Sequence, residues 1–471
     1  MYDVILIGGG PAGYLAAERL GHAKKKVLLI EEKYLGGTCL NIGCVPTKTL
    51  LNSAKLYVHA REGEKFGVKA AVSYDWSAVQ RWKDEVVSKL REGVAGQMKR
   101  FGVEVIEGRG EITAAPAGGK PGKVRSVSAG NTAEHEGQAI LVCAGSVPAV
   151  PPIPGSKDNP QVLDSTGLLS VKAVPKKLAV IGGGVIGVEF AGLFSSLGTE
   201  VTVIEMMDEI VPFMDKEQAP LLRRAMKTSG GGGTVDFKLG CKVTGIEGAA
   251  VHYSTKNGAQ EVCAADSVLM AAGRRPVLEG WGAKAAGIDT KPAGVTACDK
   301  MRTNIPGIWA AGDVTGKSLL AHSAYRMAEV AVADILAYLE GGESFRTENT
   351  WRSNAVPWAV YGIPEAAGVG LTEQEAAAKG ISVVKASLPM KVSGRFAAEN
   401  TFAGQGAVKV IASAEDRRIL GIHAVGAYAS EFIWGGAALI EQELRTEDVK
   451  QLIFPHPTVC ELIRDAAVEI Q

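Results

Sequence analysis

Leu35-Gly36-Gly37-Thr38-Cys39-Leu40-Asn41-Ile42-Gly43-Cys44-Val45-Pro46-Thr47-Lys48 is the stretch around which this chain is organised. Its two cysteines lie five positions apart, and a helical pattern of apolar residues begins at Thr47. Pro46 suits the first turn of a helix, where its missing N–H costs nothing, so we expect Cys44 to lie just before a helix N-terminus. The unpaired N–H groups and the dipole there favour a thiolate and lower the pKa of a cysteine. The pattern predicts a redox-active disulfide between Cys39 and Cys44, in a loop that Gly43 allows to bend tightly.

A pair of structural or metal-binding thiols is the alternative. Structural zinc needs about four ligands, usually in two close pairs, and apart from Cys39 and Cys44 the cysteines of this chain are scattered. The total of 7 cysteines is odd, which is typical of a cytosolic protein, where a close pair is more often catalytic than structural. We therefore expect no metal site.

Composition excludes several classes of function. The 471 residues suggest about three domains, and Lys+Arg equals Asp+Glu at 51 each. A neutral balance gives no electrostatic footprint for nucleic acid or an anionic membrane. No run of about 18 apolar residues predicts a membrane span, and the N-terminus lacks the pattern of a signal peptide. We expect a cytoplasmic protein that binds neither nucleic acid nor membranes.

The first residues carry a dinucleotide fingerprint in its full setting. Val4–Ile7 is a short apolar strand, Gly8-Gly9-Gly10-Pro11-Ala12-Gly13 follows, and a helix runs through Leu20. A second strand, Val27–Ile30, ends at Glu31. Glycines allow the turn and the close approach of a pyrophosphate to the helix N-terminus, and the acid holds a ribose hydroxyl.

The same unit occurs again further along the chain. Strand Leu178–Ile181, loop Gly182-Gly183-Gly184-Val185-Ile186-Gly187, helix Val188–Leu197 and strand Val201–Ile204 lead to Glu205. Two such units imply two different nucleotides, one of which passes electrons to the other. A carboxylate at the strand end accepts from the ribose 2′-OH of NAD and repels a 2′-phosphate, so Glu205 favours NAD over NADP.

Asp313 is a candidate for a hydroxyl contact elsewhere in the chain. It follows the strand Ile308–Ala311 and Gly312, and it precedes a helix from Leu320. The position suits binding of a polyol hydroxyl, and it equally suits an ordinary turn before a helix. The residues alone leave both interpretations open.

The C-terminal part has a different pattern and a second chemical motif. From about residue 348 the strands suggest an antiparallel sheet, with no nucleotide loop, in a module for association. His456 lies between two prolines, which hold it extended, and a helix is expected to start with Thr458 as its N-cap. Glu461 has the spacing of a capping box, or it hydrogen-bonds the imidazole and raises its basicity. Because only a thiolate attacks a disulfide, an incoming dithiol needs a base, and His456 is the best candidate.

The chain resembles the class I, glutathione-reductase-like family of flavin-dependent pyridine-nucleotide disulfide oxidoreductases. The likeness covers essentially the whole chain and rests on the cysteine stretch, both glycine loops, the Gly312-Asp313 turn and His456-Pro457-Thr458 with Glu461. One departure is Cys143-Ala144-Gly145-Ser146, where the family has Ala-Thr-Gly-Ser. Another is Cys460 beside the histidine motif, to which we assign no role.

This resemblance implies an α/β fold with two Rossmann-like dinucleotide-binding domains, for FAD and NAD, and a C-terminal α+β dimerisation domain. The implied division is 1–147 for FAD, 148–272 for NAD, 273–347 for the second part of the FAD domain and 348–471 for the interface. A homodimer follows from it.

Several roles are likewise implied by the resemblance. Cys39 would exchange with substrate, and Cys44 would face the flavin as the charge-transfer thiolate. Lys48 would lie near flavin N5, paired with Glu189, and His456 with Glu461 would complete the site of the other subunit. The residues expected to bind the two cofactors are Gly8, Gly10, Pro11, Ala12, Gly13, Glu31, Gly37, Thr38, Lys48, Gly110, Ala144, Gly145, Ser146, Gly312, Asp313, Ala321, Gly182, Gly184, Val185, Ile186, Gly187, Glu205 and Gly273.

Within the family the resemblance is greatest to members that oxidise dihydrolipoamide. It implies oxidation of protein-bound dihydrolipoamide to lipoamide, with NAD⁺ reduced to NADH, by way of the Cys39–Cys44 disulfide and FAD. The partner would be a lipoyl-carrying protein of a 2-oxoacid dehydrogenase or glycine cleavage complex. The alternatives are a sibling flavin disulfide reductase, such as a glutathione or mercuric reductase, and a non-catalytic nucleotide-binding subunit.

Overall fold

The computed structural model describes residues 1–128, 130–227, 231–341 and 350–470. It divides into two compact units. The first comprises Met1–Thr49, Arg81–Ala149 and Arg274–Arg352, and the second comprises Leu50–Gln80, Val150–Gly273 and Ser353–Gln471. The predicted boundary at 347/348 lies outside the described residues. Among the described residues, no helix combines the length and the apolar character needed to cross a membrane.

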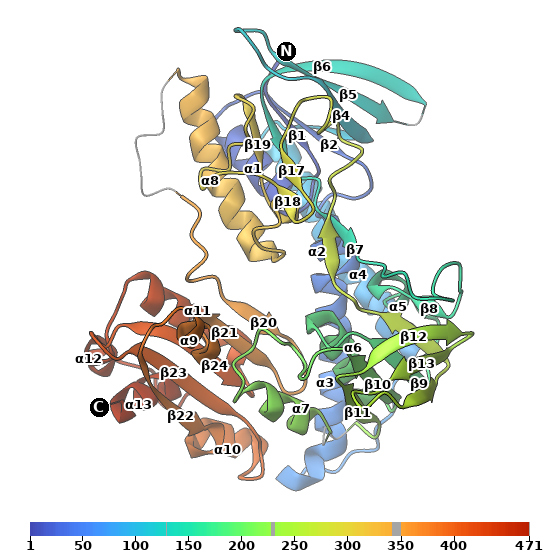
Figure 1. The fold of residues 1–471 in the computed structure, drawn as a ribbon, viewed down its shortest axis with the longest axis vertical. Coiled ribbons are helices and arrows are strands. Elements are labelled where there is room, and N and C mark those ends of the chain that lie inside the picture. The colour runs from blue at the N-terminus through green and yellow to red at the C-terminus, as the bar shows by residue number, and fades with distance from the viewer. Residues whose placement is uncertain (129, 228–230, 342–349, 471) are drawn as a thin grey trace. The chain divides into compact units, whose positions relative to one another are not determined.

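The first unit is built on a sheet of seven strands in the order β3-β2-β1-β6-β5-β4, with β19 paired to β6 (Figure 1). Strands β1, β2, β3, β6 and β19 are mutually parallel, and β4, β5 and β6 form an antiparallel meander. The inner strands read as continuous apolar runs, because a parallel sheet is covered on both faces. The strands are β1 (Tyr2–Ile7), β2 (Val27–Glu31), β3 (Glu104–Glu107), β4 (Arg109–Ala114), β5 (Gly122–Ser128), β6 (Asn131–Val142) and β19 (Ile308–Ala310).

Helices α1 (Pro11–His22) and α8 (Ala321–Leu339) lie against one another in this unit (Figure 1). The remaining elements wholly within the first unit are α2 (Gly37–Ile42), η2 (Asp313–Thr315), the pair β7 (Ser146–Pro148) and β16 (Arg274–Pro276), and the pair β17 (Thr290–Lys291) and β18 (Gly294–Val295). Helices α3 (Cys44–Glu62) and α4 (Trp76–Arg100) contribute residues to both units.

The second unit contains a parallel sheet in the order β11-β10-β9-β15-β8 and an antiparallel sheet β12-β13-β14. Helix α6 is buried on nearly every side, and its Phe190 and Phe194 pack with Leu50 of α3 in one core. The elements are β8 (Val162–Leu163), β9 (Lys177–Ile181), β10 (Glu200–Glu205), β11 (Thr234–Leu239), β12 (Lys242–Glu247), β13 (Ala250–Ser254), β14 (Gln260–Ala264), β15 (Ser267–Met270), α5 (Ser165–Leu168), α6 (Val185–Ser196), α7 (Ala219–Lys227) and η1 (Gly63–Phe66).

The C-terminal part of the second unit is an antiparallel sheet, β20-β21-β24-β23-β22. One face packs against α11 and α13, which share a core with Val410 of β23 and Ile422 of β24. The sequence did not predict β21, α9 or α10. The elements are β20 (Trp358–Val360), β21 (Ala366–Gly370), β22 (Val383–Pro389), β23 (Ala407–Ser413), β24 (Ile419–Val425), α9 (Glu373–Ala378), α10 (Gly394–Asn400), α11 (Ala429–Glu441), α12 (Thr446–Gln451), α13 (Glu461–Glu469) and η3 (Met390–Val392).

Candidate active site

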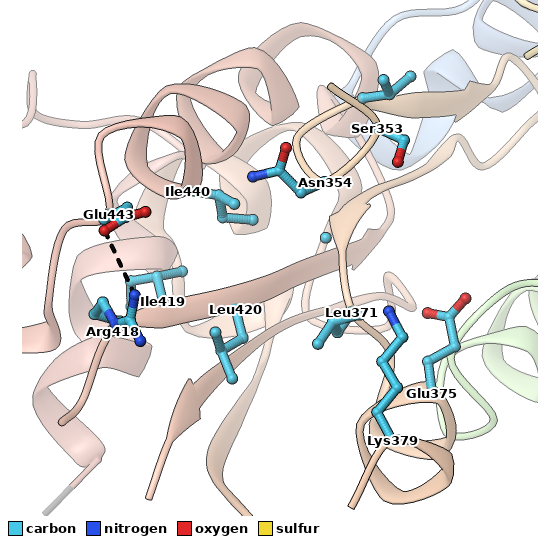
Figure 2. A pocket seen from close by; sticks show the side chains of 12 residues that line it. Ser353, Asn354, Leu371, Glu375, Lys379, Arg418, Ile419, Leu420, Ile440 and Glu443 are labelled. Carbon is cyan, nitrogen blue, oxygen red and sulfur yellow. Dashed lines mark hydrogen bonds and ion pairs between the residues drawn. The ribbon is translucent and has the colours of Figure 1, made fainter. Parts of the chain in front are cut away.

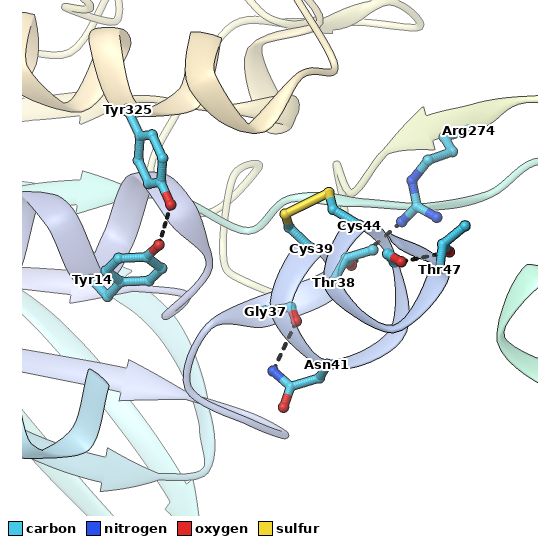
Figure 3. Close-up of a disulfide and its surroundings, with 10 residues drawn as sticks. Tyr14, Gly37, Thr38, Cys39, Asn41, Cys44, Thr47, Arg274 and Tyr325 are labelled. Carbon is cyan, nitrogen blue, oxygen red and sulfur yellow. Dashed lines mark hydrogen bonds between the residues drawn. A yellow bond between two sulfur atoms is a disulfide. The ribbon is translucent and has the colours of Figure 1, made fainter. Parts of the chain in front are cut away.

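The two cysteines of the opening stretch form a disulfide, as predicted (Figure 3). Their Cα atoms are 4.6 Å apart, which lies within the range for disulfides, and both residues are half-buried. The local structure corrects one expectation: Cys39 lies inside helix α2 rather than in a loop, and α3 begins at Cys44 itself. The Gly43 carbonyl accepts from the Thr47 N–H (3.1 Å) and from its hydroxyl (2.7 Å). Cys44 therefore lies in the first turn of a 19-residue helix, where a thiolate is favoured.

In the first glycine loop, a side chain at each glycine would meet a different neighbour. A Cβ on Gly8 would lie 2.2 Å from the Cys143 carbonyl oxygen, and a Cβ on Gly13 would lie 1.8 Å from that of Gly8. These two glycines are required by packing of the loop against β6 and against itself. Gly10 differs, since its Cβ would meet nothing closer than Gly37 Cα at 3.8 Å. Room is left at the start of α1, where a phosphate group would approach.

The second glycine loop repeats this arrangement. A Cβ on Gly182 would lie 2.5 Å from the Ala271 carbonyl oxygen, one on Gly187 would lie 2.0 Å from that of Gly182, and one on Gly184 would meet nothing within 4 Å. Val185 and Ile186 form the first turn of α6. The same pattern of contact and open space in both loops fits two dinucleotides.

Both strand-end carboxylates hold the loop beside them. Glu31 accepts from the Gly9 N–H (2.6 Å), and Glu205 accepts from the Gly183 N–H (2.5 Å) and the Met207 N–H (2.7 Å). A carboxylate offers about four acceptor positions, so each retains capacity for a ribose hydroxyl.

Asp313 belongs to a polar cluster that also contains Ser146, Arg274 and Thr38. The Ser146 hydroxyl donates to Asp313 (2.6 Å), and Arg274 donates to the Ser146 hydroxyl (2.8 Å) and carbonyl (2.7 Å). Arg274 also donates to the Thr38 hydroxyl at 3.5 Å, beside the disulfide (Figure 3). Burial raises the pKa of Asp313, and Ser146 and Arg274 oppose this rise. The cluster joins the cysteine helix to the turn that was expected to bind a polyol hydroxyl.

Three residues near the disulfide, Arg274, Tyr14 and Tyr325, were not among the predicted site residues (Figure 3). Tyr14 of α1 and Tyr325 of α8 share a hydroxyl contact, and burial raises the pKa of Tyr14 (Figure 3). None of these three side chains stands in a motif that would single it out in the sequence, since their contacts join segments far apart in the chain.

The remaining predicted cofactor residues occupy varied positions. Pro11 and Ala12 open α1, Ala321 opens α8, and Gly312 packs against Ala12 and Ala324 of those helices. Ala144 and Gly145 lie in the turn after β6, and Gly273 lies beyond β15. Packing alone accounts for a glycine at position 110, because a Cβ there would lie close against the side chains of Ile7 and Ile30.

Lys48 and Glu189 lie in different units. Glu189 is buried in α6 and accepts from the Tyr361 N–H at 2.9 Å. The pairing of Lys48 with Glu189 stays a prediction.

The C-terminal motif combines the two interpretations of Glu461. Its carboxylate accepts from the Thr458 N–H (2.8 Å) and contacts His456 Nδ1 (3.1 and 3.2 Å). The hydrogen bond from the Thr458 N–H holds the pKa of Glu461 below its usual value; burial opposes this, and the contact with His456 adds to the lowering. The expectation that Thr458 caps a helix is wrong: its hydroxyl donates to the Pro455 carbonyl, and α13 begins at Glu461.

A separate hollow lies on the C-terminal sheet, with a volume of about 470 Å³. Leu371, Leu420 and Ile440 form apolar walls, and Arg418 and Glu443 pair with one another beside it (Figure 2). It contains none of the predicted site residues.

Comparison with known proteins gives matches along nearly the whole chain. The family described as pyridine nucleotide-disulphide oxidoreductase matches residues 2–328, and its dimerisation domain matches residues 356–467. The chain is 37% identical over 473 residues to a protein of Thermus scotoductus named dihydrolipoyl dehydrogenase, covering 99% of this chain and 96% of that one. It is also 37% identical over 479 residues to dihydrolipoyl dehydrogenase 3 of Pseudomonas putida, covering 100% and 98%.

A solved structure, the HOCl-induced flavoprotein disulfide reductase RclA from Escherichia coli, is similar with a TM-score of 0.84. The two are 29% identical, and the match covers 100% of both chains. Together with the matched domains, this likeness confirms the predicted fold class.

Proposed function

Because this chain belongs to the pyridine nucleotide-disulphide oxidoreductase family, we propose that it is a flavoprotein that oxidises protein-bound dihydrolipoamide to lipoamide and reduces NAD⁺ to NADH. The observation that carries the proposal is the Cys39–Cys44 disulfide, which lies in one unit with a glycine loop and the Arg274 cluster. Names of relatives at 37% identity support dihydrolipoamide as the substrate. The matched dimerisation domain supports a homodimer.

The thiol chemistry falls to the two cysteines. A thiolate of dihydrolipoamide attacks Cys39 Sγ, the disulfide breaks, and its electron pair leaves on Cys44 Sγ. The second substrate thiol then loses its proton and attacks the substrate sulfur bound to Cys39. Lipoamide leaves, and both cysteine sulfurs hold the electron pairs taken from the substrate. Attack requires the thiolate, so the rate depends on how the substrate protons are removed.

His456 of the partner subunit is the proposed base. With Nδ1 held by Glu461, the other ring nitrogen is left to take a proton, which is the arrangement of a base oriented by a carboxylate. The imidazole side chain is 81% exposed in the single chain, so it is accessible to a second copy. Glu461 with its lowered pKa remains ionised at neutral pH and stabilises the imidazolium that forms.

The first glycine loop, Glu31, Gly37, Ser146 and Asp313 would hold FAD, and the second loop with Glu205 would hold NAD. When bound, FAD carries the two electrons from the cysteine sulfurs to NAD⁺, so that the overall reaction is dihydrolipoamide + NAD⁺ → lipoamide + NADH + H⁺. Lys48 with Glu189 near the flavin, a lipoyl protein of a 2-oxoacid dehydrogenase or glycine cleavage complex as partner, and a cytoplasmic location complete the proposal.

Replacement of His456 by glutamine tests the base. Loss of a general base costs about 10²–10⁴-fold, so His456→Gln should lower dihydrolipoamide oxidation by that factor. Reduction of the flavin by NADH should change little, because it needs no dithiol deprotonation. Steady-state rates and anaerobic stopped-flow mixing with NADH measure the two reactions.

The matched control is His252→Gln, because His252 also lies near a glutamate, Glu247, at 3.8 Å. It should leave both reactions unchanged. Oxidation of dihydrolipoamide at the wild-type rate by His456→Gln would contradict the assignment of His456 as the base.

A sibling disulfide reductase is the second candidate, favoured by the likeness to RclA. Parallel rates with dihydrolipoamide and other dithiols, each with NAD⁺ and NADP⁺, distinguish the two. A preference for another thiol substrate would replace dihydrolipoamide and leave the cysteine chemistry in place.

A further inference from the structure

Gly183, in the second glycine loop, is bonded through both of its peptide groups. Its N–H donates to Glu205, and its carbonyl accepts from the Val211 N–H at 2.8 Å. The first loop has the same pair of bonds, since the Gly9 N–H donates to Glu31 and its carbonyl accepts from the Gly36 N–H at 2.8 Å. The path of each loop therefore depends on where that second donor lies.

The two donors differ in conformational cost. Gly36 has φ +94° and Val211 has φ +44°. Glycine adopts positive φ freely, whereas a β-branched residue there is a strained outlier. Such a conformation persists only where the surroundings over-determine it. Val211 is 0% exposed, so the contacts that hold it in this conformation come from the surrounding residues and not from solvent.

That support lies in the rest of the loop between β10 and α7, residues 206–218. The Met214 N–H donates to the Val211 carbonyl (2.8 Å), and the Met214 carbonyl accepts from the Gln374 side chain (2.7 Å). Asp215, 1% exposed, accepts from Lys409 Nζ at 2.9 Å and from the Glu373 N–H at 3.3 Å. The loop is thus fastened to α9 and β23, which belong to the matched dimerisation domain.

Lys409 is the centre of this fastening. It is 0% exposed, and its ammonium lies against the carboxylates of Asp215, Glu217 and Glu373. The three carboxylates gather closely enough for a metal ion, and the lysine supplies the positive charge there. Burial lowers the pKa of Lys409, but its carboxylate partners raise it overall. The ammonium therefore stays charged at neutral pH.

Two further groups face this network. Lys385 donates to Glu217 and to Glu373, each at 2.7 Å. His423 lies opposite Lys409 on β24, and burial lowers its pKa, so the imidazole adds no competing charge at neutral pH.

We propose that Lys409 and Asp215 are positioning residues for the second nucleotide site. Their buried ion pair holds residues 206–218 so that Val211 keeps its left-handed conformation and Gly183 its orientation toward the nicotinamide dinucleotide. The inference rests on the proposed function in taking NAD⁺ as the ligand of this loop. It gives the dimerisation domain a second task within its own chain.

Asp215→Asn in the flavin-loaded protein is the main test. If the competent loop conformation falls to about a tenth of the population, the apparent Kd for NAD⁺ rises about tenfold. Calorimetric titration with NAD⁺ measures this Kd, and hydrogen–deuterium exchange should rise in the peptide spanning residues 206–218. Disulfide reduction by dihydrolipoamide without NAD⁺ should stay within about twofold of wild type, so that KM for NAD⁺ changes and the dithiol reaction does not.

Val211→Gly supplies a second, independent test. Glycine needs no support at positive φ, so Asp215→Asn should cost less NAD⁺ affinity in the Val211→Gly background than in wild type. A double-mutant cycle measures that coupling. Lys379→Met is the matched control, because it removes an exposed lysine that follows α9 and lies outside this network, and it should leave the Kd for NAD⁺ unchanged.

An NAD⁺ affinity of Asp215→Asn within twofold of wild type would overturn the inference, as would an equal fall in NAD⁺ affinity and dithiol reduction. A double-mutant cycle that shows no coupling between Asp215→Asn and Val211→Gly would also contradict the inference. A wild-type protein that binds NAD⁺ but does not oxidise dihydrolipoamide would defeat the proposed function and leave this inference standing. A wild-type protein that does not bind NAD⁺ would overturn both.

Discussion

Arg274 shows how a single side chain connects parts of the site that are far apart in sequence. Its guanidinium bonds Ser146, 128 positions away, and reaches Thr38 beside Cys39. Planar, always charged guanidinium groups suit several directed hydrogen bonds at once. The proposed flavin contacts and the reactive sulfur are thereby held in one arrangement within the first unit.

Replacement of Arg274 by methionine should weaken flavin binding. Hydrogen bonds to charged groups contribute about 1.5–3 kcal/mol, so the Kd for FAD should rise about 10–100-fold. Release of flavin on dilution, followed by its fluorescence, measures this. The adjacent Arg275 is exposed, so Arg275→Met should retain flavin as wild type does. Equal flavin loss in both variants would refute the role of Arg274.

Sequence could single out Cys39 and Cys44 from their spacing, and it made Ser146 and Asp313 candidates because the family resemblance covers the motifs in which they stand. Arg274 stands in no such motif, since its contacts depend on the pairing of β7 with β16. Lys409 was likewise invisible: a lysine in a strand is ordinarily an exposed residue, and only the tertiary structure surrounds it with carboxylates.

At the scale of elements, the two strand–loop–helix units were predictable because their constraints are local. A side chain at Gly13 or Gly187 would collide with the carbonyl group five residues earlier, that of Gly8 or Gly182. Helix ends were less predictable, since α3 began at Cys44 and α13 at Glu461. Turns and caps compete there at similar energies.

The glycine pair gives a prediction that separates the two nucleotides. A Cβ 1.8 Å from the Gly8 oxygen must displace the first loop, so Gly13→Ala should be purified with little flavin. Gly187→Ala, with a Cβ 2.0 Å from the Gly182 oxygen, should keep its flavin and lose NAD⁺ affinity. Flavin absorbance and calorimetric titration measure the two losses.

Gly93 in α4 is the matched control, because a Cβ there would meet nothing within 4 Å. Gly93→Ala should raise stability by about 0.5–1 kcal/mol and leave both nucleotides bound. Loss of flavin in Gly187→Ala as well as in Gly13→Ala would mean that the loops do not serve separate ligands.

At the scale of the whole molecule, the Lys409 network makes stability depend on pH. Burial raises the pKa of Asp215, but Lys409 brings it below its ordinary value, and Lys385 with Lys409 lowers the pKa of Glu217. Carboxyls with a depressed folded pKa stabilise the protein fully above the unfolded value, about 4. That stabilisation is lost as the pH falls through the lower folded values.

Asp215→Asn removes one of these carboxylates, so its thermal midpoint should lie below that of wild type at pH 7. The difference should shrink as the pH falls toward 3, because wild type then loses the same charge. Scanning calorimetry across this range measures it. A difference that stays constant or grows on acidification would show that Asp215 does not act through its charge.

The fold class and family were predictable from motifs spread along the chain, whereas the fastening of residues 206–218 to the C-terminal sheet was not. The motifs contain residues that the shared chemistry of the family requires. Packing between distant segments depends instead on single side chains that form no recognisable sequence motif. The role of His456 in a second subunit remains a prediction that rests on the family and on its exposure.

The central claim is that electrons pass from a dithiol through Cys39 and Cys44 to NAD⁺, and an anaerobic single turnover tests it directly. Flavin-loaded protein is mixed with dihydrolipoamide, trapped with an alkylating reagent before or after NAD⁺ is added, and examined by mass spectrometry. The account predicts alkylated Cys39 and Cys44 with one lipoamide formed per chain before NAD⁺, and protected cysteines with one NADH after it. NADH formed at the wild-type rate by Cys44→Ser, or cysteines that never become alkylated, would contradict it.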